Sequence, residues 1–132
     1  VAGFIGSPRM NFFDGRVTRA EAGVAHVTVP RLGGLEVPVA LGDVPHEGQP
    51  VKLGLRPEHF EAAGALRADL TIDVIENLGG VSYAYSSQEG DAHPVIVELR
   101  GKSRPRAGGT LTVGFEANSA LLFDAESGQR IR

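Results

Sequence analysis

The segment Val51-Lys-Leu-Gly-Leu-Arg-Pro-Glu-His-Phe60 alternates apolar and polar positions and then turns at a proline. Val51, Leu53 and Leu55 share one face of an extended backbone, because successive side chains of a strand point to opposite faces. Pro57 suits the first position of a turn or a short helix. The segment therefore predicts a β-strand with one apolar face, followed at once by a turn.

The same alternation with a period of two recurs along the chain. It is present at residues 16–19, 25–29, 35–39, 70–74, 81–86, 95–99 and 111–115. The 132 residues include 18 Gly and 8 Pro, which favour short strands joined by turns. We therefore predict an all-β fold of about eight or nine short strands, as in a barrel or a sandwich, with helical turns only at 57–65 and 117–122.

Two positions indicate how the first strands are arranged. Gly23 lies in the short connection 20–23, and a glycine that adopts a positive φ favours a hairpin there. Pro38 cannot donate a backbone hydrogen bond to a neighbouring strand, so its strand is expected at an edge or a bulge.

Composition excludes several classes of protein. The formal net charge is −3, and only 2 Tyr and no Trp are present, so no nucleic-acid surface is predicted. The chain contains no Cys, which excludes a disulfide framework and a thiolate metal site and fits a cytoplasmic protein. We expect neither a signal peptide nor a membrane span, because the chain has no basic leader and no run of roughly 20 apolar residues. Its length suits one domain or two very small packed units.

Several motifs resemble one known family over essentially the whole chain. The opening Val1-Ala-Gly-Phe-Ile-Gly-Ser-Pro-Arg-Met-Asn-Phe-Phe13 and the phrase Gly-Leu-Arg-Pro-Glu-His ending at His59 resemble the regulatory domain of ATP-binding subunits of bacterial sugar-type ABC importers. Residues 73–79 resemble its Val-Glu-x-Leu-Gly strand, and residues 115–128 resemble its closing phrase. Leu121 stands where the family often has His, so a role of that His is not transferred.

The resemblance implies a fold of two small OB-like barrels, the transport-associated OB domain. It implies residues 1–13 as the junction from an ATPase domain outside this chain, which would bind ATP and Mg²⁺, and residues 14–66 and 67–132 as approximate barrel halves. The candidate motif and interface residues that it implies are Phe4, Ile5, Gly6, Ser7, Pro8, Asn11, Phe12, Arg56, Pro57, Glu58, His59 and Phe123.

The resemblance also implies a function and partners. The domain would hold two ATPase subunits together as a homodimer, beside membrane permease subunits at the inner face of the cell membrane, and in some relatives it would receive a cytosolic regulatory protein. The imported solute would be a sugar, a polyol or a glycerol phosphate. An alternative is an oxyanion-binding OB domain of the molybdate type.

The opening segment has two interpretations from its residues. Residues 3–13 form either a strand and turn whose Phe, Ile and Met side chains fill the barrel while Asn11 bonds backbone groups, or a crossover that presents aromatic surface to a partner. An exposed apolar surface arises where a neighbouring domain has been removed. Both interpretations stay open at this point.

No catalytic group is predicted. Arg56, Glu58 and His59 lie within four residues, but consecutive side chains after a proline turn diverge, and a general base needs a cleft and an orienting partner. We expect Arg56 and Glu58 to bridge neighbouring loops and His59 to finish the turn. The chain contains no Gly-x-Ser-x-Gly, His-Glu-x-x-His or Gly-x-Gly-x-x-Gly, so this chain is not predicted to be an enzyme by itself.

Neither a cofactor nor a metal is predicted in this chain. His26, His46, His59 and His93 are dispersed and follow no ligand spacing. Arg100-Gly-Lys-Ser103 resembles the end of a P-loop, but Ile96 stands where that loop requires Gly. We expect a solvated hairpin connection there, with anion or acidic-partner binding as the alternative.

Overall fold

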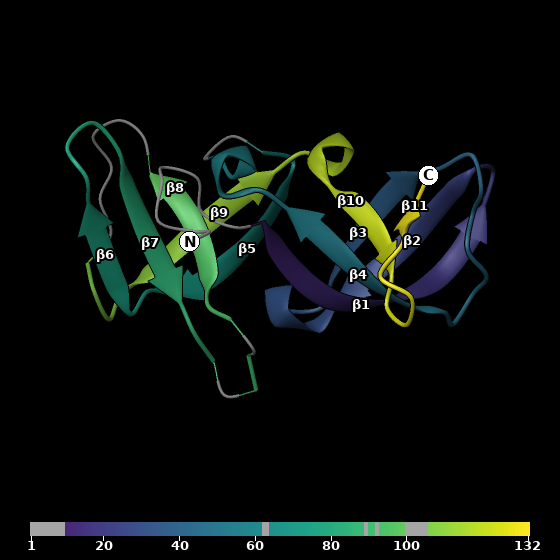
Figure 1. Cartoon of the computed structure of the whole chain (residues 1–132), viewed down its shortest axis with the longest axis horizontal. Coiled ribbons are helices and arrows are strands. Elements are labelled where there is room, and N and C mark those ends of the chain that lie inside the picture. Colours follow the sequence, from purple (N-terminus) through teal and green to yellow (C-terminus); the bar gives the residue numbers. More distant parts are fainter. Residues whose placement is uncertain (1–9, 62–63, 89, 92, 100–105) are drawn as a thin grey trace.

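The chain is built of short strands, and the prediction of an all-β fold is confirmed (Figure 1). The computed structural model describes residues 10–61, 64–88, 90–91, 93–99 and 106–132. The strands are β1 (Asn11–Glu21), β2 (Val24–Val29), β3 (Leu35–Ala40), β4 (Pro50–Leu55), β5 (Leu66–Thr71), β6 (Val74–Asn77), β7 (Ser82–Ser86), β8 (Val95–Leu99), β9 (Thr110–Phe115), β10 (Leu121–Asp124) and β11 (Arg130–Ile131). The 3-10 helices are η1 (Pro30–Leu32), η2 (Pro57–His59) and η3 (Ala117–Ser119).

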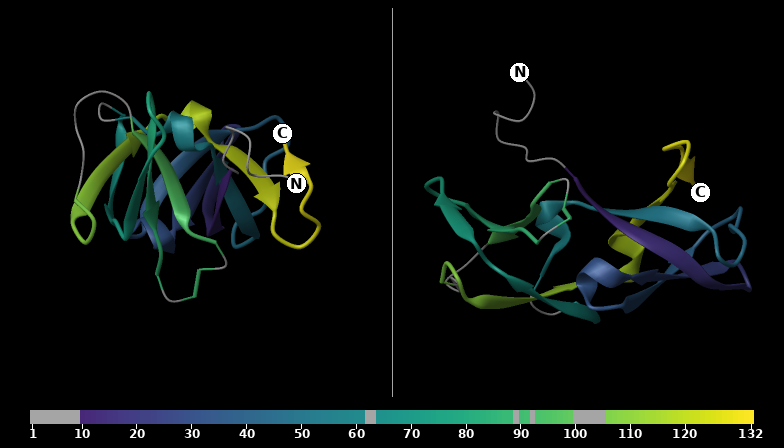
Figure 2. Two further views of the ribbon diagram at one scale, coloured as in Figure 1. Left: turned by 60° about the vertical axis from the view of Figure 1, so that its left-hand side comes forward. Right: turned by 90° about the horizontal axis from the view of Figure 1, so that it is seen from below.

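The strands form two units side by side, each with an OB-like arrangement (Figure 1). The first unit is a six-stranded antiparallel sheet in the order β11-β10-β4-β1-β2-β3. The second contains the pair β5-β9 and the three-stranded sheet β6-β7-β8. Figure 2 shows that β1 starts at the junction between the units and runs away along the first one. One contiguous apolar core includes residues of both units.

The last two strands return to the first unit after the second unit is complete. Leu122 of β10 lies opposite Leu53 of β4, and β11 adds to the outer edge of β10. In the turn between them, hydrogen bonds from Ser127 lower the pKa of Asp124 below its ordinary value. The sheet therefore crosses the boundary between residues 14–66 and 67–132 that the resemblance implies.

Three segments differ from the strands and turns expected from the sequence. The first is Pro30–Leu32, expected as part of a loop, which forms the helical turn η1. The expected strand at 70–74 divides, because Ile72 N–H bonds to the Gly109 carbonyl while Asp73 N–H bonds to the Tyr85 carbonyl. The chain thus changes from the β5-β9 pair to the β6-β7-β8 sheet at these residues. The expected helical turn at 117–122 ends at Ser119, since the following residues pair with β4.

The first strands are arranged as predicted. β1 and β2 form a hairpin whose two turn residues, Ala22 and Gly23, have φ of 53° and 76°. Positive φ at both positions is the type I′ geometry that matches the twist of a hairpin. Pro38 lies on β3, which is an edge strand of the six-stranded sheet.

Candidate functional site

The motif segments, far apart in sequence, lie side by side on the first sheet. Phe12 of β1 is opposite Gly54 of β4, and Phe123 of β10 is opposite Lys52 of the same strand. The opening, central and closing phrases therefore share three neighbouring strands. In this register, Phe12 and Phe123 lie on the same face of the sheet.

Met10, Phe12 and Phe123 cover Gly54 and form what we call the aromatic patch. The two rings meet edge to face, with centroids 5.4 Å apart. A Cβ on Gly54 would lie 2.7 Å from the sulfur of Met10 and 2.9 Å from Phe123, so the absent side chain leaves room for the patch. Phe12 is 51% exposed. An exposed apolar surface of this kind often marks an interaction site.

In the described part of the opening segment, alternate side chains of β1 point into the core and out to the surface. Both interpretations of this segment, filling of the barrel and exposed aromatic surface, therefore apply to it. Phe13 is only 2% exposed and fills the core, whereas its neighbour Phe12 is exposed on the outer face. One strand therefore contributes both a core plug and a surface ring. The predicted site residues Phe4, Ile5, Gly6, Ser7 and Pro8 lie outside the described residues.

Asn11 joins the two units. Its side-chain Nδ2 donates to the Ile96 carbonyl, and the Ile96 N–H donates to its Oδ1, both at 2.8 Å. Asn11 is 5% exposed, so both bonds are shielded from water. The side-chain amide of Asn11 thus pairs with one edge of β8 as the backbone of a neighbouring strand would. These bonds agree with the expectation that Asn11 bonds backbone groups.

We expect Asn11→Ala to lower the free energy of unfolding by about 2 kcal/mol, because it leaves a buried N–H and a buried C=O of Ile96 unpaired. Denaturant unfolding measures this loss. Hydrogen exchange should also become faster at the Ile96 amide. Asn118→Ala, at an exposed asparagine, is the matched control and should change stability by less than about 0.5 kcal/mol. Unchanged stability together with a protected Ile96 amide would contradict the role of Asn11.

The Arg-Pro-Glu-His segment forms a turn with divergent side chains. Pro57 is buried, whereas Arg56 and Glu58 are exposed. The His59 N–H donates to the Arg56 carbonyl at 2.9 Å and closes the turn, as predicted. The ion pairs among the described residues do not include Arg56 or Glu58, so the expected bridge between loops is not seen there. The Nδ1 atom of His59 is buried, and no described residue gives it a hydrogen-bond partner.

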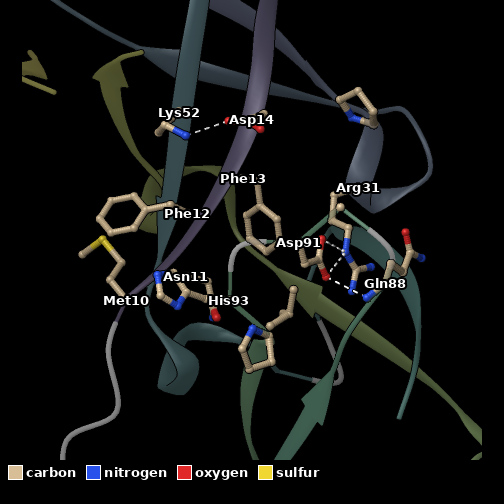
Figure 3. A pocket seen from close by; sticks show the side chains of 14 residues that line it. Met10, Asn11, Phe12, Phe13, Asp14, Arg31, Lys52, Gln88, Asp91 and His93 are labelled. Carbon is tan, nitrogen blue, oxygen red and sulfur yellow. Dashed lines mark hydrogen bonds and ion pairs between the residues drawn. The ribbon is translucent and has the colours of Figure 1, made fainter. Parts of the chain in front are cut away.

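A groove of about 780 Å³ lies between β1 and residues 88, 90–91 and 93–95 of the second unit (Figure 3). Arg31 spans it: Nε donates to both oxygens of Asp91 at 3.2 Å, and Nη2 donates to the carbonyl and the hydroxyl of Ser86. The Arg31 and Asp91 side chains are only 11% and 19% exposed. Nη1 of Arg31 is buried and has no hydrogen-bond partner within the part of the chain that the structure describes. Sequence reasoning missed this contact, because a pair 60 residues apart leaves no local pattern.

The β6-β7 hairpin contains the Val-Glu-x-Leu-Gly segment. Leu78 and Val74 are 53% and 56% exposed, and the Leu78 N–H donates to the Val81 carbonyl at the hairpin end. The Tyr85 hydroxyl donates to Glu76 at 2.9 Å. Partial burial of Tyr85 makes the largest contribution and this hydrogen bond the next largest, and both raise the pKa of Tyr85 above its ordinary value. The hairpin is a second exposed apolar surface, away from the aromatic patch.

The described residues contain no group of three or more His, Cys, Asp or Glu side chains that could hold a metal ion. Within the same part of the chain, no helix is long and apolar enough to cross a membrane. The segment Arg100-Gly-Lys-Ser103 lies outside the described residues.

The described geometry belongs to the OB class of all-β domains. A solved structure of the cytoplasmic molybdate-binding protein ModG, with molybdate bound, superimposes with a TM-score of 0.64 over 90% of this chain and 97% of that one, at 14% identity. A likeness at this identity shows the shared fold alone. It does not support the oxyanion alternative.

The family follows from the sequence comparisons. Residues 6–60 match the MalK OB fold domain and residues 53–123 match the TOBE domain. The chain belongs to the TOBE domain family, as the resemblance predicts.

Two relatives match nearly the whole chain. The lactose transport ATP-binding protein LacK of Rhizobium radiobacter is 41% identical over 135 residues, covering 100% of this chain and 37% of that protein. The sn-glycerol-3-phosphate import ATP-binding protein UgpC of Salmonella paratyphi A is 38% identical over 133 residues, covering 99% of this chain and 35% of that protein. The chain thus spans little more than a third of these relatives.

Proposed function

We propose that this chain is the regulatory and self-association part of the ATP-binding subunit of an ABC importer. The observation that carries the proposal is the match of essentially the whole chain to LacK and UgpC, whose names state lactose transport and sn-glycerol-3-phosphate import. The imported solute in this proposal is a sugar or a related compound such as a glycerol phosphate. ATP and Mg²⁺ bind in the part of such a subunit that lies outside the match.

The surface of the first unit supports a binding role rather than catalysis. Phe12 and Phe123, from the opening and closing motif segments, meet in the aromatic patch, and the ring of Phe12 is half exposed. We assign to this patch contact with another protein, either a second copy of the chain or a cytosolic regulatory protein. The other partners in the proposal are the ATPase part of the subunit and membrane permease subunits, which place the domain at the cytoplasmic face of the membrane.

A concentration series tests self-association. We expect sedimentation velocity to show a monomer–dimer equilibrium with a dissociation constant in the micromolar range or weaker, because the tether that raises effective concentration in a larger subunit is missing. Phe12→Ser should weaken the dimer by about tenfold if the ring is a central contact. Val74→Ser, at an equally exposed apolar residue of the other unit, is the control and should leave association unchanged.

Two outcomes would count against this part of the proposal. A particle that stays monomeric at millimolar concentration would exclude self-association, while the family assignment would stand. A dimer weakened by Val74→Ser and not by Phe12→Ser would move the contact to the β6-β7 hairpin.

A further inference from the structure

One edge of β1 has backbone groups that no described residue pairs. β1 pairs with β4 from Asn11 onward, but its pairing with β2 begins only at Arg16. The Val17 N–H donates to the Gln49 carbonyl on the β4 side, and N–H and C=O directions alternate along a strand. The backbone groups of Phe12 and Asp14 therefore point away from β4. Among the described residues, no hydrogen bond joins them to a partner on that side.

The hydrogen bonds of β4 give independent evidence that the backbone groups of Phe12 and Asp14 point away from β4. The Pro50 carbonyl accepts from Ala125 N–H on the β10 side of β4, so the even-numbered residues of β4 face β10. Phe12 and Asp14 are opposite even-numbered residues of β4, at 54 and 52. In both pairs the two opposite residues share no backbone hydrogen bond. The N–H and C=O groups of Phe12 and Asp14 therefore point to the edge of β1 that lies away from β4.

Pro30 keeps this edge open. Continuing the register of Arg16 and Thr28 by two residues would place Pro30 opposite Asp14. Pro30 has no N–H, and its carbonyl accepts from the N–H of Gly33, the residue that caps η1. Among the described residues, this carbonyl accepts no bond from Asp14, so Pro30 completes neither bond of the ladder. β2 ends at Val29, and the chain turns away from β1.

The open edge faces the groove between the units (Figure 3). The charged side chains of the groove already pair with one another: Lys52 with Asp14 at 2.8 Å, and Arg31 with Asp91. The groove therefore offers backbone donors and acceptors in a row, beside exposed aromatic surface at Phe12. Such an edge is complementary to another extended backbone, whereas a small anion would compete with carboxylates already in place.

We propose that the groove binds an extended peptide segment of a partner protein, which adds as a strand to residues 11–14 of β1. The segment is recognised through its own backbone, and because the groove charges are paired it takes β-branched side chains such as Val and Thr without a charge requirement. Four residues of a strand span about 13 Å, so a segment of roughly four to six residues covers the edge. This inference concerns the backbone edge of β1, which adjoins the aromatic patch at Phe12, and it does not depend on the importer assignment.

The test uses NMR titration of the ¹⁵N-labelled 132-residue chain with the probe acetyl-Thr-Val-Thr-Val-Thr-amide. We expect saturable shifts centred on the Phe12 and Asp14 amides, with residues of the β6-β7 hairpin unchanged. Two analogues, one N-methylated at both valines and one at the central threonine, block opposite edges of the added strand. One analogue should lose binding and the other should keep it.

Two variants of Asp14 test the backbone contact from the side of the protein. Asp14→Pro removes the N–H that faces the groove and leaves the β1–β4 bonds intact, whereas Asp14→Ala removes the same side chain and keeps the N–H. We expect Asp14→Pro to weaken probe binding about tenfold relative to Asp14→Ala, the effect of one hydrogen bond.

Several results would overturn the proposal. The absence of saturable shifts at millimolar probe would do so, as would equal binding of both N-methylated analogues. Shifts of the Asp14 amide with protein concentration alone that persist in Phe12→Ser, which weakens the dimer through the aromatic patch, would assign the edge to a second copy of the chain instead. Because the probe analogues need no substitution in the protein, the test stands even where Asp14→Pro fails to fold.

Discussion

Replacing Leu55 with alanine is expected to lower the free energy of unfolding by about 2 to 5 kcal/mol. Leu55 is fully buried at the end of β4, which lies between β1 and β10 in the six-stranded sheet. Truncation therefore removes apolar contacts and leaves a cavity that the surrounding strands cannot fill without moving. Arg56→Ala, at the next and exposed position, should change stability by less than about 0.5 kcal/mol.

A pair of urea titrations measures both values. Leu55 and Arg56 are adjacent in the chain but differ in burial. The difference between the two losses in the free energy of unfolding therefore reflects burial rather than position in the chain. Similar small losses for both variants would mean that Leu55 does not belong to the core of the sheet.

Replacing Gly64 with alanine is expected to cost about 3 kcal/mol, at the upper end of the effects of overpacking. A Cβ on Gly64 would overlap the backbone nitrogen of Phe115 and lie 2.6 Å from the carbonyl carbon of Gly114. Both are backbone atoms of β9, so relief requires a shift of the strand rather than a rotation of a side chain. Phe115 packs edge to face on Phe60, with centroids 6.2 Å apart, and a shift would disturb that contact as well.

Gly80→Ala is the matched control for Gly64→Ala. An added Cβ on Gly80 would have no atom of the described residues within 4 Å, and Gly80 does not have a positive φ, so alanine fits there. Thermal unfolding should show a large decrease in Tm for the first variant and almost none for the second. Equal Tm values for both variants would show that the strand around Phe115 yields easily.

Sequence patterns predicted the individual strands better than the way they assemble. The alternation around Leu53 and the turn at Pro57 are visible locally, because each depends on a few neighbouring residues. The division of the expected strand at Ile72 depends on bonds to Gly109 and Tyr85, which no local window contains. The pairing of β10 with β4 is equally non-local.

The candidate site shows the same division between local and distant information. The sequence singled out Asn11, Phe12 and Phe123, and the structure brings them to the first sheet and its junction. The sequence did not indicate that Asn11 would bond to Ile96, or that Arg31 would form an ion pair with Asp91. Those contacts exist only because the two units lie against each other.

The return of β10 and β11 to the first sheet sets an order of assembly during synthesis. Residues 61–115 form an insertion between β4 and the two strands that complete its sheet. While the ribosome is still translating the insertion, β4 lacks the neighbour that β10 later provides, and Leu53 lacks its partner Leu122. Contacts of such long sequence separation form late, and an unpaired strand edge is prone to wrong associations. The nascent first unit therefore remains an incomplete sheet until β10 and β11 emerge, and its maturation is coupled to that of the second unit.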